Sequence, residues 1–228
     1  MSTTPTPAPV TRARATIIGW LLLAGGTAFL VGGGIHPRAD ASDGGARERL
    51  RVMFEDGGWY PSQAFMLAGT AAMAVALVAL VRCRRLTGAS WARYAAVVAA
   101  VGAALASVAL LLHLLAAGEA DRLAEGGSAP ITDTVVVVDT IVIPVFGLGI
   151  AALASVGAIT RAVGNVVVAI PGVVGGVGYA LAAGTILISD HLDALFPTAI
   201  GIALWAAAVG VQLLLLDRRA AATVADSA

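Results

Sequence analysis

Apolar residues along this chain gather into six long runs separated by short polar connections. Each run holds about 20 residues, the length that crosses roughly 30 Å of hydrocarbon as an α-helix. Lipid offers no water to pair with backbone groups, so each run is predicted to be helical. The pattern predicts an all-α, polytopic bundle of six transmembrane helices at about 16–35, 59–81, 91–117, 135–160, 164–189 and 194–216.

The composition removes several classes of function. Hydrophobic residues make up 59% of the chain, charged residues 12%, and the mean hydropathy is +0.90, which no ordinary soluble domain reaches. All fourteen basic residues are Arg. Without Lys, neither a phosphate-binding Gly-Lys-Ser/Thr loop nor Schiff-base catalysis can operate. A net charge of zero gives no support for a nucleic-acid partner, and the short connections leave no room for a nucleotide-binding domain.

Charge alternates from one connection to the next. One side would hold only two acids, Asp217 and Asp226. The same side would hold nine Arg residues: Arg12, Arg14, Arg82, Arg84, Arg85, Arg93, Arg161, Arg218 and Arg219. The other side would hold five Arg and eleven acids. Because Arg-rich short loops stay inside, both termini are predicted to be cytoplasmic. The Arg-only, Ala- and Gly-rich composition indicates a bacterial source, and hence the cytoplasmic (inner) membrane.

The domain layout follows from these spans. Residues 1–15 are predicted to be a disordered cytoplasmic tail, residues 16–217 the bundle, and residues 218–228 a second cytoplasmic tail. A competing interpretation is a signal peptide cleaved near Ala39-Asp40-Ala41. The apolar run before that point is longer than a signal core, and no polar domain follows it.

Two extramembrane segments lie on the outer side. Apolar residues recur at helical spacing within 46–55, which predicts an amphipathic helix that either lies on the membrane surface or caps the bundle. The loop from Gly118 to Asp133 is acidic and Gly-rich and is predicted to be irregular.

The three His residues all fall near the outer ends of the spans. His36 ends the first span, His113 lies about 6 Å inside the third, and His191 lies between the fifth and sixth. Three imidazoles at similar depth make a transition-metal site, or a haem site, a candidate. The alternative is that these residues are solvated or cap helix ends and that the protein holds no cofactor.

Asp139 is the other candidate functional residue. It lies about one turn into the predicted fourth span, with Pro144 shortly after it. An ionisable group inside a span usually faces the bundle interior or a partner, and His113 is a candidate partner in a proton relay. If the span begins only at Thr140, Asp139 is an ordinary interfacial acid.

Aromatic and small residues mark surfaces of two kinds. Trp59 with Tyr60, and Trp91 with Tyr94, are predicted to lie in the outer and inner aromatic belts. The Gly-rich stretch from Gly172 to Gly178 is typical of helices that pack closely.

A short set of residues resembles a known family. Gly33-Gly34-Ile35-His36-Pro37, an acidic loop and then Trp59-Tyr60-Pro61-Ser62-Gln63 resemble a family of uncharacterised six-span bacterial inner-membrane proteins. In that family a second His often follows the Trp, where this chain has Gln63. The resemblance implies six spans and no established activity, and the missing His argues against a metal role.

Two functions remain open from the sequence. The first is a non-catalytic membrane subunit or accessory protein that associates through its small-residue faces with another membrane protein or with itself. The second is a small transporter or ligand-binding membrane protein with an outer polar pocket of His36, His113, Asp139 and His191. An enzyme is the less favoured interpretation, and any catalysis would have to use His, Asp and Glu at the outer face.

Overall fold

The computed structural model describes residues 9–38, 44–83, 86, 89–185 and 188–225. Its long helices are α1 (Pro9–Gly34), α3 (Trp59–Arg82), α4 (Ser90–Ala116), α6 (Pro130–Ile159), α7 (Val166–Ala182) and α8 (Ile200–Ala225). Shorter helical elements are α2 (Ala46–Glu55), η3 (Ala117–Glu119), α5 (Ala120–Ala124), η4 (Ala183–Thr185) and η5 (Asp190–Ala199). No strand occurs among the described residues, so the predicted all-α class is confirmed.

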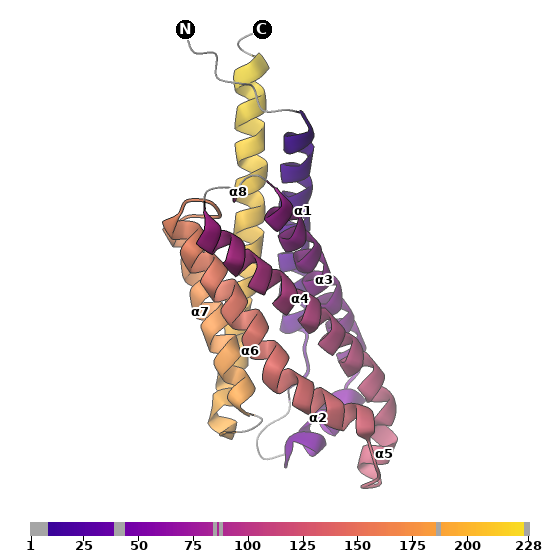
Figure 1. Ribbon diagram of the computed structural model, residues 1–228. Helices are drawn as coiled ribbons and strands as arrows, with labels where there is room; N and C mark the ends of the chain where they lie inside the picture. The colour runs from indigo at the N-terminus through magenta and orange to yellow at the C-terminus, as the bar shows by residue number, and fades with distance from the viewer. Residues whose placement is uncertain (1–8, 39–43, 84–85, 87–88, 186–187, 226–228) are drawn as a thin grey trace.

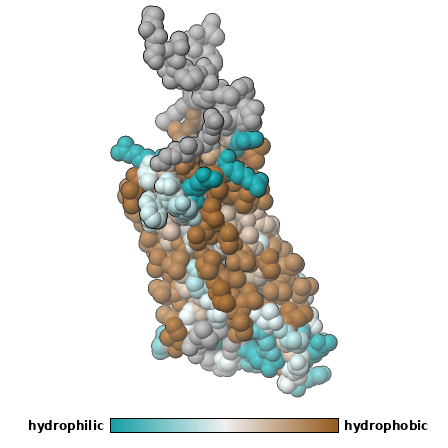
Figure 2. Space-filling model, viewed as in Figure 1, coloured by the Kyte–Doolittle hydropathy of each residue, from teal (hydrophilic) through white to brown (hydrophobic). Residues whose placement is uncertain are grey.

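The six long helices are each long and apolar enough to cross a membrane. They form a closed ring in chain order, because each packs against the next and α8 packs back on α1 (Figure 1). Successive spans run antiparallel, because each begins at the end of the bundle where the one before it finished (Figure 1). A hydrophobic belt covers the middle of the visible face, with polar residues toward both ends (Figure 2). The chain is therefore a helical bundle with the surface of a multi-pass membrane protein.

Several boundaries differ from the sequence prediction. α6 begins at Pro130, whose missing N–H suits the first helical position, and so starts five residues before the predicted span. α1 begins at Pro9 and α8 continues to Ala225, so both enter the regions predicted as tails. The rest of those tails, residues 1–8 and 226–228, lies outside the described residues, and so does the alternative cleavage site at 39–41.

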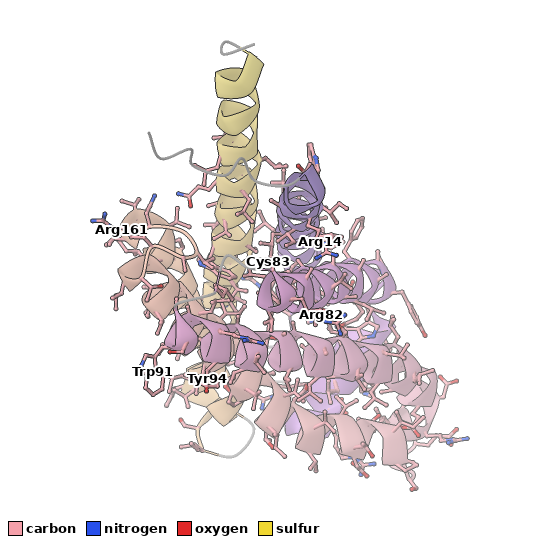
Figure 3. All side chains as sticks on the ribbon, turned by 45° about the horizontal axis from the view of Figure 1, so that its top comes forward. Arg14, Arg82, Cys83, Trp91, Tyr94 and Arg161 are labelled. Carbon is pink, nitrogen blue, oxygen red and sulfur yellow. The ribbon has the colours of Figure 1, made fainter. Side chains whose placement is uncertain are left out.

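The two ends of the bundle carry different polar groups. Figure 3 turns toward the viewer the end at which α3 ends and α4 begins, with exposed Arg14, Arg82 and Arg161 around it. The opposite end, called the outer end after its predicted side, carries α2 and α5 (Figure 1). There the outer loop expected to be irregular is largely helical, since η3 and α5 occupy Ala117–Ala124.

Glu119 explains how this loop is held. Its carboxylate is buried and accepts hydrogen bonds from the backbone N–H groups of Ile131 (3.3 Å) and Thr132 (2.9 Å) and from the Thr132 hydroxyl (3.0 Å). The first turn of a helix leaves its N–H groups without intrahelical partners, and a carboxylate also suits the positive end of the helix dipole. Glu119 thus joins the end of α4 to the start of α6.

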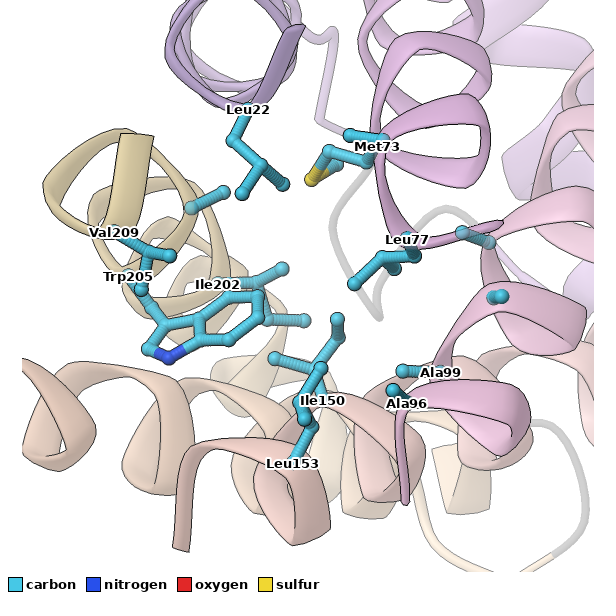
Figure 4. Packing of buried hydrophobic residues seen from close by; sticks show 14 of the residues in the cluster. Leu22, Met73, Leu77, Ala96, Ala99, Ile150, Leu153, Ile202, Trp205 and Val209 are labelled. Atoms are coloured by element: carbon cyan, nitrogen blue, oxygen red, sulfur yellow. The ribbon is translucent and has the colours of Figure 1, made fainter. Parts of the chain in front are cut away.

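The interior of the ring is filled by side chains. Large aliphatic residues and the indole of Trp205 meet from α1, α3, α6 and α8, while α4 contributes Ala96 and Ala99 (Figure 4). Small residues also bring backbones together: a Cβ added at Gly147 would collide with the carbonyl oxygen of Gly176. The Gly-rich stretch of α7 therefore packs inside the bundle, against α6 and α8.

Candidate functional site

Asp139 lies well inside a helix. Because α6 begins at Pro130, Asp139 is nine residues in, about 14 Å along the axis. Its side chain is 13% exposed. α6 thus begins well before Thr140, but this fixes the start of the helix and not the start of its membrane-spanning part, so the alternative of an interfacial Asp139 stays untested. An acid at this position requires a partner, because a charge in hydrocarbon is costly.

His113 of α4 is that partner. Its Nε2 lies 2.8 Å from Oδ2 of Asp139, and its side chain is 14% exposed. α4 and α6 are neighbours in the ring, so the two side chains meet directly across a helix interface. The same distance suits an imidazole N–H that donates to a carboxylate and a carboxyl O–H that donates to a neutral imidazole. The pair can therefore hold a proton on either partner.

His36 makes a separate contact with Gln63 of α3. Its Nδ1 lies 2.6 Å from the carbonyl oxygen of Pro37, which can only accept, so Nδ1 carries the proton. Its Nε2 is then free to accept from the Gln63 amide nitrogen at 3.1 Å. Burial lowers the pKa of His36, and the nearby charges of His113 and Arg38 act in the same direction, although the Pro37 contact opposes them. Geometry and burial both favour a neutral imidazole.

Trp59 connects the two contacts. Its indole lies edge-on to the His36 ring at 5.3 Å between centroids and contacts the His113 ring at 5.6 Å. Its exposed fraction is 0%, so the prediction that Trp59 lies in an aromatic belt is wrong. Tyr60, the next residue, is 53% exposed and fits that belt. Trp59 and Gln63 are four residues apart on one helix face, which is the signal that links both to this site.

α2 covers the outer end of the cluster. Leu50 and Phe54 of α2 are buried, and the Phe54 ring lies 4.8 Å from that of Trp59. Arg47 ties α2 to the second outer loop through Asp133 at 3.2 Å and the carbonyl oxygen of Gly127 at 3.2 Å. Of the two alternatives for this amphipathic helix, the structure supports the one in which it caps the bundle.

Three buried polar atoms of this cluster have no hydrogen-bond partner among the described residues: Nε1 of Trp59, Oε1 of Gln63 and Nδ1 of His113. Buried polar groups are normally paired with protein or water. Besides Trp59 itself, the side chains are His113, whose ring contacts Trp59, and Gln63, which bonds His36. The cluster therefore presents one donor, the indole N–H of Trp59, and one acceptor, Oε1 of Gln63, that no described residue pairs.

His191 does not join the cluster. It lies in η5, its side chain is exposed, and its backbone N–H donates to the Ser189 hydroxyl at 3.4 Å. Within the described ranges no three His, Cys, Asp or Glu residues are grouped so that they could hold a metal ion. Of the four residues predicted for the pocket, His36 and His113 both contact Trp59 and Asp139 pairs with His113, whereas the predicted three-His set is not assembled.

We name the set His36, Trp59, Gln63, His113 and Asp139 the outer polar cluster. Sequence reasoning identified both His residues and Asp139 but placed Trp59 at the surface and treated Gln63 only as a missing ligand. Comparisons with protein-family models, with curated proteins and with solved structures found no match to this chain.

Proposed function

We propose that this chain is a multi-pass protein of the bacterial cytoplasmic membrane, with both termini inside, that binds a proton or a small polar ligand at its outer polar cluster. The observation that carries the proposal is the 2.8 Å pair of His113 and Asp139 within two spanning helices. Ionisable residues at such depth are expensive and usually serve function.

The packing favours this function over that of an accessory subunit. The hypothesis of an accessory subunit requires small-residue helix faces that are left free for a partner helix. Gly147 and Gly176 instead face each other, and Gly175 lies against the backbone of Ile202. The outward surface of α4 carries bulky aliphatic side chains, including Val97, Val108 and Leu111, which suit lipid.

Charge supports the orientation. Arg14, Arg82 and Arg161 are exposed at one end of the bundle (Figure 3), and Arg93 is exposed in the first turn of α4. Short Arg-rich connections stay in the cytoplasm. The outer polar cluster then lies near the extracytoplasmic face, beneath α2. Any ligand or proton would reach it from outside the cell.

Proton exchange at the pair can be tested by infrared difference spectroscopy. We expect protein in lipid nanodiscs, titrated between about pH 4 and pH 9, to show a buried carboxyl C=O band that is absent in Asp139→Asn. Glu125→Gln, which removes an exposed acid of the outer loop, should leave the band in place. A spectrum without any band that depends on Asp139 would contradict proton binding at this site.

The orientation can be tested separately by labelling from outside intact cells. In a variant without the native cysteine, Ser128→Cys should react with a membrane-impermeant maleimide. Thr160→Cys, exposed at the opposite end, should react only after the membrane is opened. The reverse pattern would overturn the assigned topology while leaving the cluster's chemistry untouched.

A further inference from the structure

A shallow groove runs between α3 and α4 in the half of the bundle nearer the Arg-rich end. Its volume is about 240 Å³, and it is lined by Val78, Val81, Arg82, Val97, Ala100, Val101 and Ala104. Ala100 and Ala104 form the hollow because their side chains end at Cβ. Val78, Val97 and Val101 are 40%, 42% and 50% exposed, so the groove opens outward, where a bilayer places its hydrocarbon.

One guanidinium group lines the end of this groove, and a second lies one turn before it on the same face of α4. Arg82 lines it and follows Val78 by four residues on α3. Arg93 precedes Val97 by four residues and Ala100 by seven on α4, so it shares their helix face. Both Arg side chains are exposed, and neither has an ion-pair partner within the part of the chain that the structure describes.

Two Arg residues at the opposite end are paired within the protein. Arg47 is paired with Asp133 at 3.2 Å, and Arg51 is paired with both Glu48 and Glu55 at 2.6 Å. The protein neutralises these cations with its own acids. Arg82 and Arg93 have no such partner among the described residues, so they are available to an anion from the surroundings.

Aromatic residues place this end at the membrane interface. Trp91 and Tyr94 are 74% and 65% exposed, and their rings contact each other at 6.1 Å (Figure 3). Exposed Trp and Tyr mark the level of lipid head groups. Arg82 and Arg93 lie in the last turn of α3 and the first turn of α4, next to this level. Their guanidinium groups are therefore at the depth of the lipid phosphates, with the apolar groove directly toward the membrane interior.

We propose that this groove is a binding site for one anionic phospholipid, with an acyl chain in the groove and the head-group phosphodiester on Arg82 and Arg93. Guanidinium groups bind phosphate oxygens through paired, charge-assisted hydrogen bonds. The net negative charge of the lipid balances two cations that have no ion-pair partner among the described residues. The site is independent of the outer polar cluster and stands or falls without it.

Native mass spectrometry of the detergent-released protein tests the site. The probes are dioleoyl phosphatidylglycerol, dioleoyl phosphatidylcholine and the tail-free head group glycerophosphoglycerol. We expect a one-to-one adduct with phosphatidylglycerol in preference to phosphatidylcholine, and no competition from the tail-free head group. Equal binding of both lipids, or full competition by the tail-free head group, would overturn the proposal.

Matched variants separate the groove from general charge. Arg82→Gln and Arg93→Gln should each weaken phosphatidylglycerol binding about fivefold, and the double variant about 30-fold. Arg161→Gln removes one Arg at the same end but outside the groove and should change nothing. Ala104→Phe should fill the hollow and abolish preferred binding, whereas Leu105→Phe, on the neighbouring exposed surface, should not. Equal losses in Arg161→Gln and Arg82→Gln would show surface charge alone and refute the site.

Discussion

The contact between His113 and Asp139 is either a buried ion pair or an ordinary interhelical hydrogen bond, and the two differ in magnitude. Removing one member of a buried ion pair costs roughly 3–5 kcal/mol, because the other charge is left uncompensated. Interhelical hydrogen bonds in membrane proteins average only about 0.6 kcal/mol, with about 1.7 kcal/mol at the upper end. The 2.8 Å separation fits both, but side chains only 13–14% exposed leave little solvent to screen a charge, so we predict the larger value.

A double-mutant cycle decides between them. His113→Phe keeps a planar ring, and Asp139→Leu keeps a branched side chain of moderate size. Each single replacement should lower the free energy of unfolding by about 3 kcal/mol, since it strands a polar partner. The double replacement should cost less than either single one, because no stranded group remains. The coupling energy should therefore exceed about 3 kcal/mol.

The measurement is the free energy of unfolding in lipid–detergent bicelles, titrated with a denaturing detergent and followed by circular dichroism. Thr134→Val serves as the control, because Thr134 is exposed on α6 and bonds only its own helix at Pro130. It should change stability by less than about 0.5 kcal/mol. A coupling energy of about 1.7 kcal/mol or less would refute the buried ion pair.

Two further predictions concern the scaffold. Gly147→Ala should destabilise the bundle by about 1–3 kcal/mol, because its Cβ would push α6 away from α7. Gly33→Ala is the control, because Gly33 has open space around it. In the same unfolding assay it should be neutral or stabilising by up to about 1 kcal/mol. Glu119→Ala should cost about 1–3 kcal/mol and speed amide hydrogen exchange at the start of α6, because it removes the partners of two backbone N–H groups. Glu125→Ala, an exposed acid of the same loop, should leave both stability and exchange unchanged.

The outer polar cluster was partly accessible from the sequence. His113 and Asp139 stood out because ionisable residues are rare within apolar runs, and the structure pairs them. Trp59 was misplaced because a Trp at the start of a span is ordinarily an interface residue, and local sequence does not reveal that α2 folds over it. His191 was grouped with the other two His residues by depth alone. Depth fixes one coordinate of a residue and leaves its position around the ring open.

The number, type and approximate limits of the spanning helices were determined by the sequence itself, because the length of an apolar run and the hydrogen-bonding needs of the backbone are local quantities. The ring order was decided only in the tertiary structure. That order sets which faces meet, and so it places Asp139 on His113, Gln63 on His36 and Phe54 on Trp59. These helices are hydrophobic on nearly all sides, so the sequence lacks the polar–apolar contrast that would identify the contacting faces. The faces that meet are instead decided by side-chain complementarity between helices.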